Sequence, residues 1–360
     1  MRVALIYDRL NKIGGAEAVL VQFAGLYPDA DWYTSVWDPN RAPFSRNWRV
    51  HTSWLSRIPW LRTHHEWIPF LMPFIFESFD FSSYDLVISI GSAEAKGIIT
   101  RPGTVHLNYC LTPTRYLYSH AKEYLNNPLY RWIANFLRKW DLVASSRPDE
   151  MIAISTQVKK RIKDVYNRET DVIFPPVDTQ KFQVNAAFKP DFHDYYLTVS
   201  RLVSYKKIDI LMQAFNQNGK TLVIVGDGSE RTRLKRMAKS NVHLVGLVAD
   251  DELVGYYQQA VAFLQANEED FGISMCEAQA AGIPVLAYKK GGAADIVVDG
   301  STGILLEAAD SKSVNAGIDR FETMKFDKAL CQSNAKRFDQ SVWKTQIQKR
   351  IDKLCQKQQM

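Results

Sequence analysis

Residues 268–284 read Glu268-Glu269-Asp270-Phe271-Gly272-Ile273-Ser274-Met275-Cys276-Glu277-Ala278-Gln279-Ala280-Ala281-Gly282-Ile283-Pro284. An apolar run from Val261 to Leu264 precedes this stretch, another from Ile283 to Tyr288 follows it, and both have the composition of buried strands. The acidic residues between them indicate a loop, and the small residues after Gly272 indicate a helix. The order strand, loop, helix, strand predicts a parallel sheet with the loop at the edge where such sheets bind ligands.

Two glutamates in this stretch, Glu269 in the loop and Glu277 in the helix, have seven residues between them. Phosphates at the helix N-terminus would meet the amides of Phe271, Gly272 and Ile273, and Gly272 would allow a close approach of the backbone. Glu269 would then bind hydroxyls at one end of the ligand, and Glu277 a diol at the other. From the spacing alone, a merely solvated acidic loop is an equally good interpretation.

The motif Glu269-x-Phe271-Gly272, with Glu277 after it and Ala281-Gly282-Ile283-Pro284-Val285 behind it, resembles the signature of family 4 glycosyltransferases. The resemblance implies a retaining hexosyltransferase of the GT-B fold that needs no metal and uses a nucleotide-diphosphate sugar. It also implies that Glu269 faces the donor sugar and that Glu277 binds the ribose hydroxyls. It covers nearly the whole chain and is strongest from Ser200 to Gly303.

Length and alternation predict the domain organisation. The chain has 360 residues, enough for two domains, and its second half alternates strands with helices. We therefore expect an α/β protein with two Rossmann-like domains whose parallel sheets face each other across a cleft. The expected parts are an acceptor-binding domain over 1–178, a linker over 179–194, a nucleotide-sugar-binding domain over 195–337, and a last helix over 338–360 that returns to the first domain.

A basic loop, Arg201 to Lys207, follows the predicted strand 196–200. The Arg201 guanidinium, which can donate two parallel hydrogen bonds, and the Lys206 ammonium would together clamp a diphosphate. The alternative is a solvated basic turn. The resemblance favours the clamp, because family members carry Arg and Lys at these positions on the donor diphosphate. Lys207 stands where the family often has glycine.

Glycine turns predict further contacts with the donor. Gly14 and Gly15 separate a strand from a helix, and the resemblance puts such a loop over the donor phosphates. The Gly-x-Gly-x-x-Gly fingerprint of dinucleotide-binding enzymes is absent, which argues against a dehydrogenase. Gly226 should line the same edge, and Val248 should lie near the base. Gly291-Gly292 either closes on the phosphates or simply turns the chain.

The loop after the strand 105–110 reads Leu111-Thr112-Pro113-Thr114-Arg115-Tyr116. Relatives commonly have His-Thr-Pro-x-Arg-Tyr here, and their His approaches the donor sugar. Leu111 replaces that His, so the contact is missing. Thr112 and Arg115 are expected on the acceptor side, and a structural ion pair is the alternative for Arg115.

Residues 48–81 are rich in tryptophan and other apolar residues, with arginines between them, and three prolines interrupt the segment. Tryptophan and arginine together are typical of segments that lie in a membrane interface. We expect peripheral membrane contact through this segment, with a helical insertion packed on its own domain as the alternative.

Other features limit the compartment, cofactors and partners. The four cysteines form no Cys-x-x-Cys pair, no run of 18 apolar residues exists, and the N-terminus shows no signal-peptide pattern. We therefore expect a cytoplasmic protein, at or near the inner face of the membrane. No nucleic-acid-binding pattern is present. Glu268 and Asp270 would suit a metal, but the Arg201–Lys206 clamp makes one unnecessary.

The expected donor is GDP-mannose first and a UDP-sugar next, without a further cofactor, and the expected acceptor is a glycan or a lipid-linked sugar of surface polysaccharide synthesis. Two other functions are compatible with the sequence. One is a GT-B sugar-nucleotide epimerase or hydrolase, and the other is a non-catalytic, membrane-associated module that binds nucleotide sugars.

Overall fold

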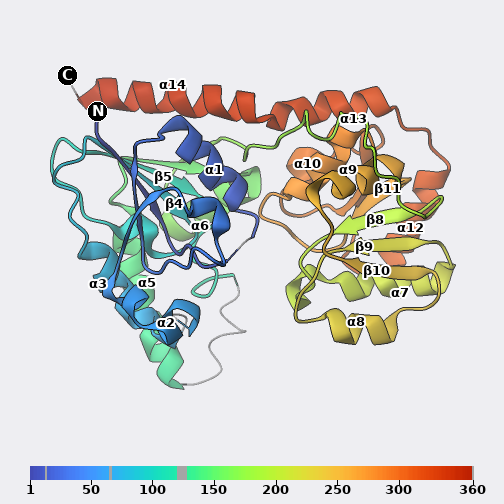
Figure 1. Ribbon diagram of the computed structural model, residues 1–360, viewed down its shortest axis with the longest axis horizontal. Helices are drawn as coiled ribbons and strands as arrows, with labels where there is room; N and C mark the ends of the chain where they lie inside the picture. The colour runs from blue at the N-terminus through green and yellow to red at the C-terminus, as the bar shows by residue number, and fades with distance from the viewer. Residues whose placement is uncertain (13, 65–66, 120–127, 359–360) are drawn as a thin grey trace. The chain divides into compact units, whose positions relative to one another are not determined.

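The computed structural model describes residues 1–12, 14–64, 67–119 and 128–358. The chain forms two units, Met1–Pro175 with Trp343–Met360, and Pro176–Val342. Each unit is a parallel sheet with helices on both faces (Figure 1). The predicted pair of Rossmann-like α/β domains is confirmed.

The sheet of the first unit has the strand order β3-β2-β1-β4-β5-β6-β7, with every pair parallel. Its direction of growth reverses between β1 and β4, which is where open α/β sheets bind ligands. The strand β4 is buried along its whole length, as expected for a parallel sheet covered on both faces. The strands are β1 (Val3–Tyr7), β2 (Asp31–Thr34), β3 (Arg49–Thr52), β4 (Leu86–Gly91), β5 (Val105–Cys110), β6 (Glu150–Ala153) and β7 (Asp171–Val172).

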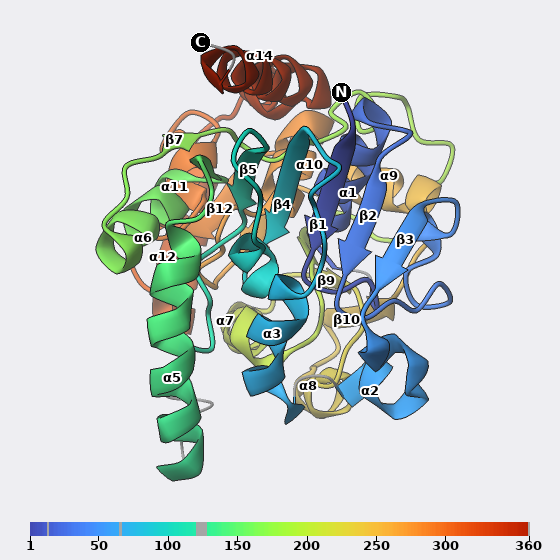
Figure 2. The ribbon, with the colours of Figure 1, turned by 90° about the vertical axis from the view of Figure 1, so that its left-hand side faces the viewer.

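Helices cover both faces of this sheet (Figure 2). On one face, Phe23 of α1 packs edge-on against Tyr109 of β5 and against Trp343 of α14. On the other face, Phe76 of α3 packs with Ala4 and other residues of β1 and β4. The helices are α1 (Glu17–Leu26), α2 (Pro59–His64), α3 (Met72–Glu77), α5 (Pro128–Ser145), α6 (Thr156–Tyr166) and α14 (Gln340–Gln358), with short 3₁₀ turns η1 (Pro43–Ser45), η2 (Trp54–Arg57), η4 (Pro69–Leu71) and η5 (Glu94–Gly97).

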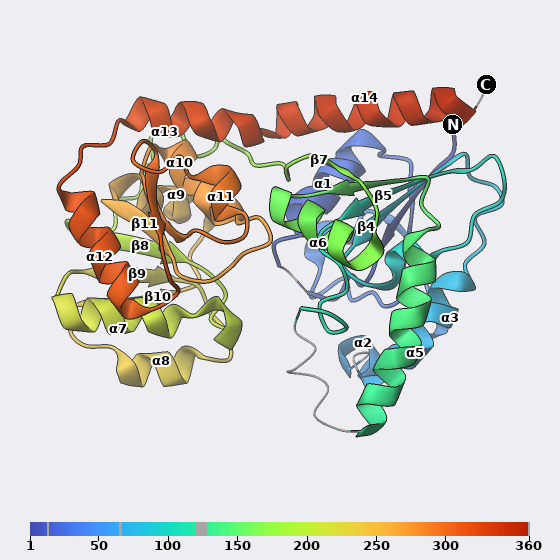
Figure 3. The same cartoon turned by 180° about the vertical axis from the view of Figure 1, so that it is seen from behind.

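The sheet of the second unit repeats this topology in the order β10-β9-β8-β11-β12-β13, and it reverses between β8 and β11. Figure 3 shows α7 and α12 on one face and α9 and α10 on the other. The strands are β8 (Tyr196–Val199), β9 (Leu222–Val225), β10 (Val242–Gly246), β11 (Ala262–Gln265), β12 (Val285–Tyr288) and β13 (Gly303–Leu306). The helices are α7 (Ile208–Asn218), α8 (Arg231–Met237), α9 (Asp250–Gln259), α10 (Ile273–Ala281), α11 (Ala293–Ile296), α12 (Ser311–Glu322) and α13 (Lys328–Ala335), with 3₁₀ turns η6 (Ser204–Lys206) and η7 (Lys336–Phe338).

The segment 179–194, which we expected to be a linker, is part of the second unit. The buried ring of Phe182 packs edge-on against Tyr257 of α9. Gln258, also on α9, donates hydrogen bonds of 2.9 Å and 2.7 Å to the carbonyls of Phe182 and Val184. These contacts hold the segment on α9. At the other boundary, residues 338–342 also belong to the second unit, and α14 joins the first unit from Trp343.

Segment 48–81 contains a strand, β3, that the sequence did not predict. This strand lies at the edge of the sheet, and its residues are alternately exposed and half-buried. It therefore lacks the apolar run by which the other strands were recognised. Most of the rest of the segment forms η2, α2, η4 and α3, and residues 65–66 lie outside the described residues.

Candidate functional site

A pocket opens in the second unit at the carboxyl ends of β8 and β11, where the strand order reverses. This is the position at which open α/β sheets bind ligands. Its lining comes from β8, η6, α7, the loop after β11 and the first turn of α10. The residues are Thr198, Val199, Ser200, Lys206, Ile208, Leu211, Gln265, Ala266, Asn267, Glu269 and Ser274.

A cation, a carboxylate and an amide converge in this pocket. The Lys206 ammonium forms an ion pair with Oε1 of Glu269, and Asn267 Nδ2 donates a hydrogen bond of 2.9 Å to the same oxygen. The Lys206 and Glu269 side chains are 17% and 15% exposed, so both can still reach a ligand. The sequence predicted functional roles for Lys206 and Glu269, but not for Asn267.

Two glycines fasten the acidic loop that carries Glu269. The amide of Gly292 donates a hydrogen bond of 2.9 Å to the carbonyl of Glu269, and Gly291 forms a parallel bridge with Glu269. A Cβ at Gly292 would lie 1.9 Å from the carbonyl oxygen of Phe271, so a larger residue cannot fit without a backbone shift. Gly291-Gly292 therefore supports the acidic loop.

The N-terminus of α10 faces this pocket through Ser274. Gly272 precedes the helix with a φ of 105° and, as a glycine, makes no side-chain capping hydrogen bond to it. Amides left without helical partners in a first turn are suitable donors for a phosphate. The ring of Phe271 packs against Phe338 with ring centroids 5.5 Å apart, so its side chain belongs to the core of the second unit.

Glu277 lies on α10, next to α9. Its Oε2 accepts a hydrogen bond of 2.8 Å from the hydroxyl of Tyr257. Burial raises the pKa of the Glu277 carboxyl, and the hydrogen bond from Tyr257 and the charge of Lys181 oppose that rise. Burial also raises the pKa of Tyr257 well above its ordinary value, so its hydroxyl remains a donor. The sequence did not indicate Tyr257, because no local pattern connects it to Glu277.

The other predicted residues of the second unit lie around the pocket but do not line it. Arg201 is exposed and donates a hydrogen bond of 2.6 Å to the hydroxyl of Tyr205. Gly226 has a φ of 134°, and a Cβ there would lie 1.9 Å from the carbonyl oxygen of Ser200. Gly226 thus allows the turns after β8 and β9 to pack together. Val248 is half-buried after β10.

The remaining predicted residues belong to the first unit. Gly14 and Gly15 lie between β1 and α1. Thr112 and Arg115 follow β5, and the Thr112 hydroxyl is buried and accepts a hydrogen bond of 3.4 Å from Arg161. Leu111 is half-buried at the same strand end.

A pair of carboxylates that the sequence analysis did not predict lies between β1 and β4, where the strand order of the first sheet reverses. Asp8 follows β1 and accepts hydrogen bonds of 2.9 Å from the amides of Ser92 and Ala95. The buried Glu94 accepts a hydrogen bond from the hydroxyl of Tyr116. Burial, followed by the charge of Asp8, raises the pKa of Glu94 to about 7. The sequence does contain a signal for Glu94, because this residue comes three positions after the end of an apolar strand.

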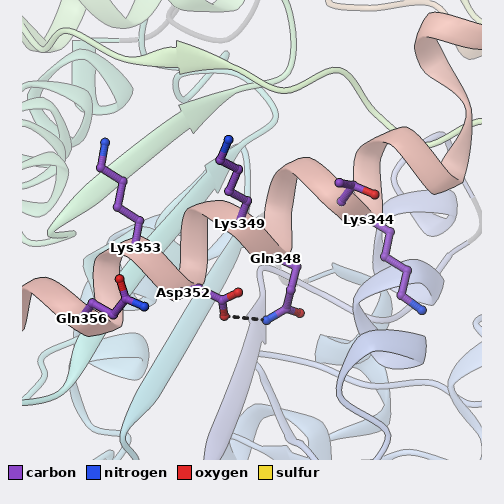
Figure 4. Close-up of a pocket in the computed structure, with 7 residues that line it drawn as sticks. Lys344, Gln348, Lys349, Asp352, Lys353 and Gln356 are labelled. Carbon is purple, nitrogen blue, oxygen red and sulfur yellow. Dashed lines mark hydrogen bonds between the residues drawn. The ribbon is translucent and has the colours of Figure 1, made fainter.

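A larger hollow runs along the surface of α14, and it does not form a site like the pocket of the second unit. Figure 4 shows Lys349 and Lys353 extending to one side of the helix and Lys344 to the other, and the Gln348–Asp352 hydrogen bond, 2.9 Å long, joins two of the residues drawn there. The lining residues all come from one helix, and no polar groups converge. We interpret this hollow as a solvated helix face.

Within residues 1–12, 14–64, 67–119 and 128–358, no three or more His, Cys, Asp or Glu side chains are grouped so that they could hold a metal ion. In the same part of the chain, no helix combines the length and the apolar character needed to cross a bilayer.

Residues 179–338 match the family model "Glycosyl transferases group 1". The chain is 28% identical over 208 residues to a GDP-mannose-dependent alpha-(1-6)-phosphatidylinositol monomannoside mannosyltransferase of Mycobacterium tuberculosis, covering 50% of this chain and 53% of the relative. It is 34% identical over 115 residues to a GDP-mannose-dependent alpha-mannosyltransferase of Corynebacterium glutamicum, covering 32% and 28%. The chain thus spans about half the length, or less, of these curated relatives.

The fold is shared with solved structures over nearly the whole chain. The Anabaena protein HepE in complex with UDP superimposes with a TM-score of 0.73, although only 19% of residues are identical, and the match covers 98% of this chain and 100% of HepE. At this identity the likeness concerns the fold alone. The predicted GT-B class, with its two Rossmann-like domains, is confirmed.

Proposed function

We propose that the chain is a retaining glycosyltransferase, and the match of residues 179–338 to the family model of group 1 glycosyl transferases supports this proposal. It moves a hexose from a nucleotide-diphosphate sugar to a glycan or lipid-linked acceptor. The observation that carries the proposal is the convergence of Lys206, Glu269 and the first turn of α10 on one pocket.

In the proposed reaction, the bond between the sugar carbon and the diphosphate oxygen breaks, and a bond from that carbon to the acceptor oxygen forms on the same face. The proton of the acceptor hydroxyl goes to the leaving diphosphate. Lys206, Arg201 and the amides of α10 stabilise the negative charge that develops on the diphosphate. Glu269 binds the hydroxyls of the donor sugar, and Glu277 binds the ribose. These charges take the place of a metal ion.

Mannose is the first choice of sugar, and GDP-mannose of donor, because two similar relatives are named as GDP-mannose-dependent enzymes. A UDP-sugar is the second choice, since HepE was solved with UDP. Leu111 cannot supply the contact that a histidine makes in relatives. The choice of sugar therefore depends on Glu269 and its neighbours in the second unit.

We also propose that the first unit contacts an anionic bilayer through segment 48–81, aided by α5. Five aromatic side chains are each more than half exposed there: Trp54, Trp60, Trp67, Phe74 and Trp132. Figures 1 and 2 both show α2, α3 and one end of α5 at the same end of the unit. Arg57 on η2 and Lys139 on α5 are exposed cations. Aromatic side chains with cations favour an anionic membrane interface.

The transferase activity is tested by incubating the protein with GDP-mannose or UDP-glucose and with lipid-linked or soluble glycan acceptors. Mass spectrometry should detect a new glycoside, and NMR should show that the anomeric configuration of the donor is kept. Release or isomerisation of the sugar without an acceptor would instead support the epimerase or hydrolase function. Binding of the donor without any turnover would support a non-catalytic module.

The membrane contact is tested by co-sedimentation with phosphatidylcholine vesicles prepared with and without phosphatidylglycerol. We expect binding to the anionic vesicles and its loss in a Trp60→Ser, Trp67→Ser double variant. Leu247→Ser is the matched control, because Leu247 is 79% exposed but belongs to the second unit. Equal binding by the double variant and the control would contradict the proposal.

A further inference from the structure

Lys206 and Glu269 are each other's charge partner in the structure. Under the proposed function they serve different parts of the donor, since Lys206 binds the diphosphate and Glu269 the sugar. A diphosphate carries more negative charge than one carboxylate, so it competes with Glu269 for the Lys206 ammonium. A bound donor therefore weakens one of the contacts that hold the Glu269 side chain.

Asn267 is the second partner of Glu269. Its side chain is only 5% exposed, and its Nδ2 donates a hydrogen bond of 2.9 Å to Oε1, the oxygen that also faces Lys206. An amide carries no net charge, so a diphosphate attracts it far less than it attracts the Lys206 ammonium. The contact from Asn267 to Glu269 can therefore persist when Lys206 turns to the donor.

We propose that Asn267 is a positioning residue that keeps Glu269 directed at the donor sugar while the diphosphate takes Lys206. The Lys206–Glu269 ion pair then acts as an internal competitor of the diphosphate. This inference rests on the proposed function of the site. It makes two opposite predictions for neighbouring side chains: loss of Asn267 harms the binding of the sugar, and loss of the Glu269 charge favours the binding of the diphosphate.

A purely structural role for Asn267 has a different signature. Its Nδ2 also lies 3.4 Å from the carbonyl oxygen of Glu268, a contact that would hold the backbone of the acidic loop. Loss of that contact would disturb the loop as a whole. Both the diphosphate and the sugar would then bind less well, whereas a positioning role affects only the sugar.

The first test is the Asn267→Leu variant, which keeps a similar size but cannot donate a hydrogen bond. Calorimetry is carried out with GDP and GDP-mannose, and with UDP and UDP-glucose. We expect the Kd for the nucleoside diphosphate to stay within about twofold of the unmodified protein, and the Kd for the intact donor to rise roughly tenfold or more. An equal rise in the Kd of both ligands, or no rise in either, would overturn the inference. Thermal unfolding checks that the variant is folded.

The second test compares Glu269→Gln with Glu268→Gln, which removes the same charge from the exposed neighbouring residue. We expect Glu269→Gln to bind GDP or UDP roughly three- to tenfold more tightly, because Lys206 no longer has a competing partner. Weaker or unchanged binding, or an equal gain in Glu268→Gln, would refute the competition. If the unmodified protein binds neither nucleoside diphosphate, the proposed function fails together with this inference. If it binds one of them normally, only this inference is at stake.

Discussion

Lys206 and Arg201 lie on one loop but in different surroundings. Lys206 lines the pocket and pairs with Glu269, whereas Arg201 is exposed and bonded to Tyr205. A turn of the Arg201 side chain toward a diphosphate exchanges a hydrogen bond to a neutral hydroxyl for one to an anionic oxygen, which is stronger. The exposed position is therefore compatible with a role in the clamp.

The substitutions Lys206→Ala and Arg201→Ala should each reduce turnover far more than folding. Each removes a cation that faces the leaving diphosphate, and the loss should be about 2–4 kcal/mol of transition-state stabilisation, or roughly 30- to 900-fold in kcat/KM. Steady-state kinetics with the donor found in the transfer assay measures the effect. Lys207→Ala is the control, since Lys207 is an adjacent exposed lysine outside the pocket. Normal turnover in either folded variant would remove that residue from the clamp.

Glu277 should make nucleotide binding depend on pH. Burial raises the pKa of its carboxyl, and the protonated form accepts fewer hydrogen bonds from a ribose, so affinity should fall as the pH falls through that pKa. Tyr257→Phe removes the hydrogen bond that lowers the pKa of Glu277. The pKa should then rise further, and the affinity for the nucleotide should be lost at a higher pH. Calorimetry with GDP or UDP between about pH 5 and pH 8 measures the shift. Tyr256→Phe, the control, should leave the profile unchanged, and equal profiles for all three proteins would contradict this role.

Among single residues, the sequence predicted those that follow a strand and belong to a recognisable motif. Lys206 and Glu269 come from loops after β8 and β11, and parallel strands that are neighbours in a sheet bring such loops together. Asn267 and Tyr257 could not be predicted, because their partners are set by tertiary packing rather than by spacing.

Among the elements, the 3₁₀ turn η6 has an unusual end. Lys207 follows it with a φ of 52°, a left-handed conformation that glycine adopts more easily than lysine. This explains why glycine is frequent at this position in the family that the sequence resembles. The lysine is accommodated because its side chain is exposed.

Lys207→Gly should therefore stabilise the second unit slightly. Relief of the left-handed strain outweighs the greater chain entropy of glycine, and the gain should be up to about 1 kcal/mol with turnover unchanged. Denaturant unfolding of the variant beside Lys207→Ala measures it, since alanine keeps the strain. A less stable glycine variant would show that the lysine side chain itself contributes to the fold.

Elements with apolar runs were predictable, and elements without them were not. The strand β5 occupies the predicted residues 105–110, and β8, Tyr196–Val199, covers all but the last of the predicted residues 196–200. The strand β3 was missed because it is an exposed edge, and 179–194 looked like a linker because only a few of its residues, such as Phe182, are apolar. In both cases burial against a neighbour, and not composition, decides the structure.

For the molecule as a whole, we expect activity without a divalent metal. The proposed mechanism neutralises the leaving diphosphate with Lys206, Arg201 and helix amides, so EDTA should change the rate of transfer by less than about twofold. The same assay with added Mg²⁺ or Mn²⁺ provides the comparison. An enzyme that EDTA silences and either metal restores would direct attention to Glu268 and Asp270.

The helix α14 has a consequence for how the protein is made. Its residues Trp343, Ile347, Ile351 and Leu354 are buried in the first unit, although they are translated after the entire second unit. At typical rates of synthesis, residues 1–175 leave the ribosome on the order of ten seconds before the helix that completes their core. During that interval Phe23 and Tyr109 lack their Trp343 partner. The nascent chain is therefore most prone to aggregation late in translation, when most of its length has already been synthesised.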